Sequence, residues 1–73
     1  MSAAKYLVVY EKGQSSIGAY VPDLPGCVAV GVTLAETKQL IRKAVKIHLA
    51  AMRRDRLPIP KPTTRSEYLE LAG

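Results

Sequence analysis

Few side chains in this sequence are of the types that carry out catalysis, and those present lack the partners that catalysis needs. His48 is the one histidine among 73 residues, so it has no second imidazole with which to bind a metal. Its position on the apolar side of a predicted helix favours a packed histidine held by a single hydrogen bond. Cys27 lies between Gly26 and Val28, a setting typical of a small core residue rather than of a reactive thiolate. We therefore predict no catalytic residues, no metal site and no cofactor.

The carboxylates are also too sparse for a metal-dependent nuclease. Of six Asp and Glu residues, Glu11, Asp23 and Glu36 are the three in the part of the chain predicted to fold compactly. A two-metal site requires several carboxylates that converge on one point. The sequence also has no Gly-rich phosphate-binding loop and no nucleophile elbow. It therefore predicts a binding protein and not an enzyme.

The composition is that of one small globular domain over residues 1–73. The sequence is 48% hydrophobic and 23% charged, which is too apolar for an intrinsically disordered chain. Its apolar runs are all far shorter than the about 20 residues of a transmembrane helix. The N-terminus has no long apolar stretch of the kind that signal peptides carry, and a single cysteine fits a reducing compartment. We expect a cytoplasmic protein with no membrane partner.

Positive charge is concentrated in the second half of the chain. The net charge is +5, yet residues 38–65 alone carry +8, between two slightly acidic segments. Arg42, Lys46 and Arg53 fall on one side of a predicted helix, where they could contact nucleic acid, an acidic protein or only solvent. No aromatic residue accompanies them on that helix to stack on bases, so nucleic-acid binding is the alternative rather than the first hypothesis.

Three short segments have strand-like sequences. Residues 5–11 are rich in β-branched and aromatic residues and are apolar on both faces, which predicts a strand in the middle of a sheet. Residues 17–21 alternate between apolar and other positions, and residues 27–31 form a third short strand. The short connections between these segments predict an antiparallel meander.

A long helix is predicted over residues 34–54. Thr33 and Glu36 match a capping box, and no glycine or proline interrupts the segment that follows. The apolar arc of this helix is wider than one sheet can cover. We therefore expect part of it to pack on another chain, with Leu40 and Ile47 in the seam of a homo-oligomer.

Residues 22–26 (PDLPG) form the most specific local feature. Their two prolines restrict the backbone and Gly26 permits a positive φ, which predicts a rigid corner. A rigid corner can also serve as a recognition loop, because it loses little conformational freedom on binding. The two interpretations are compatible, and in the second Asp23, Leu24 and Pro25 contact a partner.

The segment after the helix has less certain structure. Residues 58–62 alternate proline with other residues and predict an extended, polyproline-like connector. Residues 64–71 are ambiguous. Thr64 and Glu67 could form a second capping box, whereas the tyrosine and leucines that follow suit a short strand.

Parts of the sequence resemble the HicB antitoxin family. They are residues 18–27 (GAYVPDLPGC), residues 31–34 (GVTL) and residues 57–62 (LPIPKP). The resemblance covers residues 5–62 and implies an α+β fold of order β-β-β-α-β, in which one long helix covers a small antiparallel sheet. This fold is similar to a truncated ribonuclease-H domain without its catalytic carboxylates. It favours a fourth strand for residues 64–71 and implies a homodimer or homotetramer.

The resemblance also implies a partner. HicB proteins typically neutralise HicA, a small basic RNA-cleaving toxin, by covering its active surface. Many carry a second, DNA-binding domain, but in a chain of 73 residues we expect none. The family's helix commonly carries glutamates where this one has Lys43 and Lys46, and like charges facing each other across an interface cost several kcal/mol. Either the toxin docks on the less basic sheet and the corner, or this protein has another role.

Two hypotheses follow for function. The first is a non-catalytic HicB-like antitoxin that binds and neutralises a HicA-type toxin. The alternative is a nucleic-acid-binding module that uses Arg42, Lys46 and Arg53.

Overall fold

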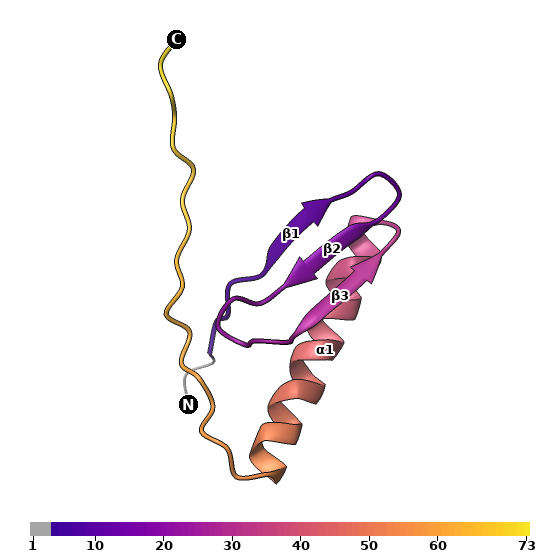
Figure 1. The fold of residues 1–73 in the computed structure, drawn as a ribbon, viewed down its shortest axis with the longest axis vertical. Helices are drawn as coiled ribbons and strands as arrows, with labels where there is room; N and C mark the ends of the chain where they lie inside the picture. The colour runs from indigo at the N-terminus through magenta and orange to yellow at the C-terminus, as the bar shows by residue number, and fades with distance from the viewer. Residues whose placement is uncertain (1–3) are drawn as a thin grey trace.

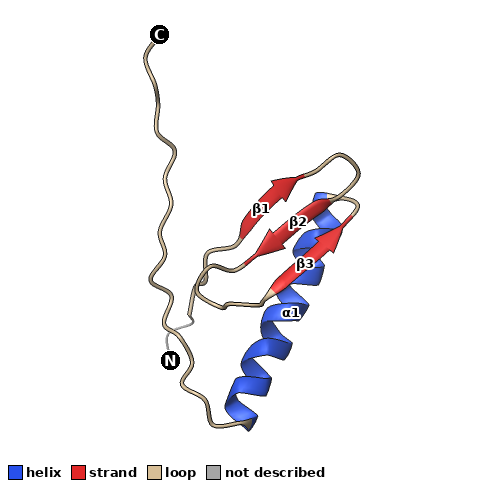
Figure 2. Cartoon of the chain, in the orientation of Figure 1, coloured by secondary structure: helices blue, strands red, loops and turns tan. Residues whose placement is uncertain are grey.

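The computed structural model describes residues 4–73 and contains three strands followed by one helix. The elements are β1 (Val9–Lys12), β2 (Ile17–Tyr20), β3 (Val28–Gly31) and α1 (Leu34–Arg54). The strands form one antiparallel sheet of order β1-β2-β3, and α1 packs on one face of it (Figures 1 and 2). This arrangement confirms the α+β class, the meander and the single long helix.

The register of the sheet separates two faces. Tyr10, Ala19 and Ala29 stand opposite one another on the face toward α1, because side chains alternate along each strand. The buried core lies between this face and the helix, and is extended by the corner after β2. Its members are Ala19, Val21, Leu24, Cys27 and Ile41.

Both ends of α1 are closed by local hydrogen bonds. At the start, the Thr33 hydroxyl accepts a hydrogen bond from the Glu36 N–H at 3.1 Å, and the Glu36 carboxylate accepts one from the Val32 N–H at 2.9 Å. At the end, Arg56 adopts a left-handed φ of 54°, and the Leu57 N–H donates to the Met52 carbonyl at 2.9 Å. The predicted helix over residues 34–54 is confirmed at both ends.

The helix approaches the sheet most closely at β3. A Cβ atom at Gly31 would lie 2.5 Å from Oγ1 of Thr37, so only glycine fits there without displacement. Thr37 is fully buried, and its hydroxyl lies 2.8 Å from the Thr33 carbonyl and 3.3 Å from the Ile17 carbonyl. These contacts hold α1 over β2 and β3, and the inner face of β1 extends beyond the helix.

The first strand is not in the middle of the sheet. β1 is an edge strand, paired with β2 on one side only, and the prediction of a central strand over residues 5–11 is wrong. Its apolar residues are instead half-buried, because its inner face lines a groove beside α1 and its other face belongs to the outer surface of the sheet.

A fourth strand is absent from residues 4–73, so the predicted β-β-β-α-β order is wrong in its last element. The segment after Leu57 is extended and projects beyond the sheet (Figure 1). A strand needs a neighbour for its backbone groups and a face to bury. Here the segment pairs with no strand, and its large apolar side chains remain exposed: Tyr68, Leu69 and Leu71.

Candidate interaction surfaces

The corner at residues 22–26 holds the connector that follows the helix. The carboxylate of Asp23 accepts hydrogen bonds from the backbone N–H groups of Thr63 and Thr64, at 3.1 and 3.0 Å. The hydroxyls of the same two threonines donate to it at 3.2 and 2.7 Å. The side chain of Thr64 makes the largest contribution, and together these bonds lower the pKa of Asp23. Asp23 is thus engaged by its own chain.

The remaining corner residues divide between core and surface. Leu24 is fully buried, so its side chain is not on the surface where a direct contact with a partner requires it to be. Pro25 and Gly26 are exposed, and Gly26 has a φ of 83°. The predicted corner is confirmed, with a positive φ at Gly26 and backbone hydrogen bonds that close the turn. Of the three residues predicted to contact a partner, Pro25 is exposed and Asp23 is half-buried.

The outer face of the sheet is apolar and open. Val28 and Val30 are exposed at 61% and 64% of their surface, and Val32 just beyond β3 at 72%. Tyr20 stands beside Val28 in the register, and Gly18 beside Val30. The six strand residues on this face include one charged side chain, an acidic one, and no cation: Val9, Glu11, Gly18, Tyr20, Val28 and Val30.

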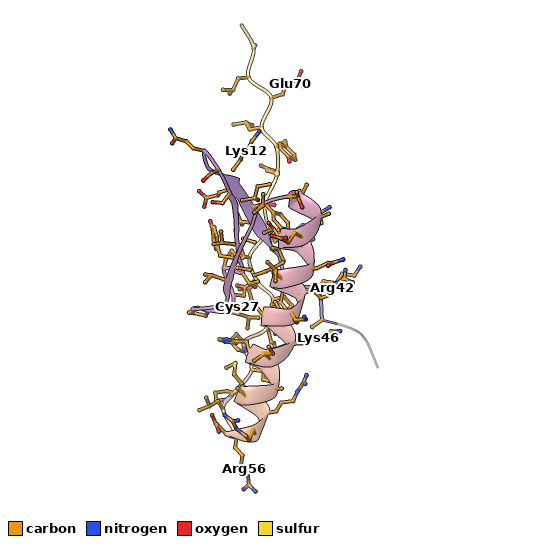
Figure 3. The ribbon with its side chains drawn as sticks, turned by 90° about the vertical axis from the view of Figure 1, so that its right-hand side faces the viewer. Lys12, Cys27, Arg42, Lys46, Arg56 and Glu70 are labelled. Carbon is orange, nitrogen blue, oxygen red and sulfur yellow. The ribbon has the colours of Figure 1, made fainter. Side chains whose placement is uncertain are left out.

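A groove of about 520 Å³ lies between α1 and the uncovered inner face of the first strand segment. Its helix wall carries Lys38, Arg42 and Lys46, and its strand wall carries Tyr6 and Tyr10. Ile41 and Val45 contribute apolar surface to it. Figure 3 shows the two layers edge-on and places Arg42 and Lys46 on the helix layer, away from the outer face of the sheet.

The predicted basic residues are therefore only partly brought together. Arg42 and Lys46 share the groove, whereas Arg53 lies in the last turn of α1 and does not line it. Within residues 4–73, no cation of the groove forms an ion pair, and the pair that does form joins Arg54 to Asp55 at 3.2 Å. Lys38, which sequence reasoning left out of the set, completes the row.

The two predicted seam residues lie on the other flank of the helix from the groove, given about 100° per residue. Leu40 and Ile47 are exposed at 38% and 66%, so neither is used in the core of this chain. His48 is half-buried on the side of α1 that faces the sheet. Cys27 is buried, and desolvation raises the pKa of its thiol, which disfavours the reactive thiolate.

Across residues 4–73, no three His, Cys, Asp or Glu side chains gather where they could hold a metal ion. In the same part of the chain, α1 is not apolar enough to cross a membrane.

Residues 6–71 match the model of a protein family described as the HicB-like antitoxin of bacterial toxin–antitoxin systems. The chain belongs to this family. The matched residues include those of both surfaces, the corner and the connector. It confirms the resemblance that the sequence motifs indicated, and it places the chain among antitoxins rather than enzymes.

One curated relative is a phage protein. The chain is 31% identical over 64 residues to a protein described as an uncharacterized 14.9 kDa protein in the rep-hol intergenic region of Haemophilus phage HP1 (strain HP1c1). The match covers 88% of this chain and 48% of the phage protein, so the chain spans about half the length of that relative. No solved structure matches the chain.

Two features of these surfaces escape sequence reasoning. The threonines that bind Asp23 lie 40 and 41 residues away from it, and no local pattern links them. The tyrosines of the groove are likewise distant in sequence from the cations that face them. The one available signal was their four-residue spacing, which puts Tyr6 and Tyr10 on the same face of the strand predicted over residues 5–11. In the structure Tyr10 lies on β1 and Tyr6 in the segment before it.

Proposed function

We propose that this chain is the antitoxin of a small, basic, RNA-cleaving toxin of the HicA type, and that the toxin docks on the outer face of the sheet. The apolar surface formed by Val28, Val30 and Val32 carries this proposal. Exposed apolar surfaces of this kind, bordered by polar residues, mark protein-binding sites. Family membership supports a toxin as the partner.

Charge favours the sheet over the helix as the toxin-binding face. A basic toxin on the cationic side of α1 would meet Lys38, Arg42 and Lys46, and such like-charge contacts cost several kcal/mol. The outer face of the sheet has no cation among its strand residues, and Glu11 adds a negative charge at its β1 side. A basic partner therefore meets no repulsion there.

The corner extends the same surface. Pro25 is exposed between β2 and β3, close to the end of β3 at which Val28 lies. The hydrogen bonds of Asp23 to the connector hold this loop in one conformation before the partner arrives. A preorganised loop loses little conformational freedom on binding, which favours affinity.

The experiment compares three tagged chains expressed in the cells from which the protein comes. They are the wild type, Val30→Lys on the outer face, and Leu57→Lys as a control at another exposed apolar site. Both substitutions add one positive charge at an exposed position, so they alter net charge equally. Each sample is treated with nuclease and washed with rising salt before the retained proteins are identified.

We expect wild type and Leu57→Lys to retain a small basic protein at near-equal stoichiometry, and Val30→Lys to lose it. Once separated, that protein should cleave RNA, and added wild-type chain should stop the cleavage. A retained protein that does not cleave RNA, or that binds Val30→Lys as well as wild type, would falsify the proposal.

A further inference from the structure

The groove beside α1 combines a row of cations with two aromatic rings, and neither takes part in the proposed toxin interface. Lys38, Arg42 and Lys46 form one wall and Tyr6 and Tyr10 stand on the other. We propose that this groove binds single-stranded nucleic acid, with the cations on its phosphates and the tyrosines against its bases.

The spacing of the cations suits a sugar–phosphate backbone. They lie four residues apart on α1, so each is displaced from the next by about 6 Å along one side of the helix. A regular row of this kind follows successive phosphates of an extended strand, as in other grooves that bind single strands. In the described residues none of the three cations is in an ion pair, so their charges are free to contact phosphates.

The tyrosines supply what the basic helix lacks. Both rings are half-buried and pack partly against the core, which fixes their positions. The hydroxyl of Tyr6 also donates a hydrogen bond to the Pro60 carbonyl at 2.5 Å, so the connector holds this ring. Fixed rings in a groove stack on bases of any sequence. Bases inside a duplex are already stacked on one another, so the groove selects single strands.

An acidic peptide fits the groove less well. The final segment of a second copy carries Glu67 and Glu70, two carboxylates for a row of three cations. A polynucleotide accounts for the regular spacing of the cations through its phosphates, and for both tyrosine rings through its bases. Because the groove and the outer face of the sheet lie on opposite sides, a strand can bind here while a toxin occupies the sheet.

The test is titration of the purified chain into fluorescein-labelled oligonucleotides of about 12 nucleotides, within the range that single-strand-binding grooves cover. Three probes are used: a single-stranded RNA, a DNA strand of the same sequence, and the corresponding DNA duplex. Fluorescence anisotropy at several salt concentrations gives the affinity and its salt dependence. The two single strands show whether the ribose hydroxyls contribute, and binding of either supports the proposal.

Two paired variants separate the groove from general positive charge. Arg42→Gln with Lys46→Gln removes two cations of the groove, and Lys43→Gln with Arg53→Gln removes two from the same helix outside it. With three phosphates contacted, the wild type should show a slope of about −2 in log affinity against log salt. The groove variant should bind at least about tenfold more weakly with a slope of about −0.7, while the control keeps the wild-type slope.

A third variant tests stacking. Tyr10→Leu keeps apolar bulk against the core and should weaken single-strand binding about tenfold without changing the salt slope. Equal affinity for the duplex, or equal losses in the groove and control variants, would overturn the proposal. The proposal would also be overturned if the wild type bound no oligonucleotide and the groove variant differed from it in oligomeric mass. The groove would then hold the acidic segment of a second copy.

Discussion

The outer face of the sheet and the groove beside α1 are built partly by the same strand, yet they present opposite surface chemistry. On β1, Val9 faces outward and Tyr10 faces the groove, one residue apart. The outer face has exposed valines and no cation among its strand residues, whereas the groove has three cations and two tyrosines. The alternation of a single strand thus separates the surface that we propose for a basic protein from the groove that we propose for single-stranded nucleic acid.

The difference makes the net charge of +5 compatible with the basic toxin that we propose as partner. Net charge describes the whole molecule, but a docked partner meets only the charges at one face. In this chain the excess of lysine and arginine is carried by α1 and the segments that follow it. Figure 3 places Arg42 and Lys46 of α1 on the helix layer, away from the proposed toxin face.

The largest expected effect is on the free energy of unfolding, because both surfaces depend on the same buried core. Leu24 is fully buried in the corner, so Leu24→Ala should lower the free energy of unfolding by about 2–5 kcal/mol. Pro25→Ala, at the exposed neighbouring position, should change it far less. Urea denaturation followed by circular dichroism measures both. Similar losses for the two variants would show that the corner is not anchored through Leu24.

The next effect separates the two surfaces. Val30→Lys should weaken toxin binding by about 30-fold or more, as expected for a charge placed within an apolar contact. The groove variant, Arg42→Gln with Lys46→Gln, should bind the toxin at least as tightly as the wild type, because it removes repulsion. Isothermal titration calorimetry with the isolated toxin measures both. The comparison fails if the groove variant loses the toxin and Val30→Lys retains it.

A third surface can be tested through the oligomeric state. Leu40 and Ile47 are exposed on the flank of α1 opposite the groove, and we predict that they pack in a homodimer or homotetramer. Ile47→Glu should reduce the molar mass measured by light scattering to that of the monomer, because it puts a charge in an apolar seam. An unchanged mass would remove Ile47 from the seam, and would leave both other surfaces unaffected.

The smallest effect concerns the link between the corner and the connector. Hydrogen bonds from Thr64 and Thr63 lower the pKa of Asp23, so the carboxylate contributes stability that is present above its ordinary pKa of about 4. That contribution is lost as the pH falls below this value and the carboxylate becomes protonated. The amide resonances of Thr63 and Thr64 should shift in this pH range. An Asp23 that titrates at or above the usual aspartate value would contradict the hydrogen-bonded link.

Local sequence patterns predicted the type and bounds of most elements well, but they did not predict which elements lie beside one another. The capping residues Thr33 and Glu36 placed the start of α1, and the proline-rich corner was recognised as rigid. The apolar run at residues 5–11 was misplaced in the sheet, because a strand with two apolar faces can be central or can be an edge beside a groove. The prediction of a fourth strand failed because residues 64–71 form no strand pairing, although residues 66–68 line a hollow beside β1.

The candidate surfaces could be predicted only in part for the same reason. Arg42 and Lys46 were found from helical periodicity, but the tyrosines that face them come from another element. Asp23 was singled out as a residue of the corner, while the threonines that bind it became visible only in three dimensions.

The central claim is that the toxin is held by the outer face of the sheet, and inhibition of RNA cleavage tests it most directly. The isolated toxin cleaves a labelled RNA, and increasing amounts of wild type, Val30→Lys or the groove variant are added. We expect complete inhibition near one equivalent by wild type and by the groove variant, and little inhibition by Val30→Lys. Full inhibition by Val30→Lys, or its loss in the groove variant alone, would contradict the account.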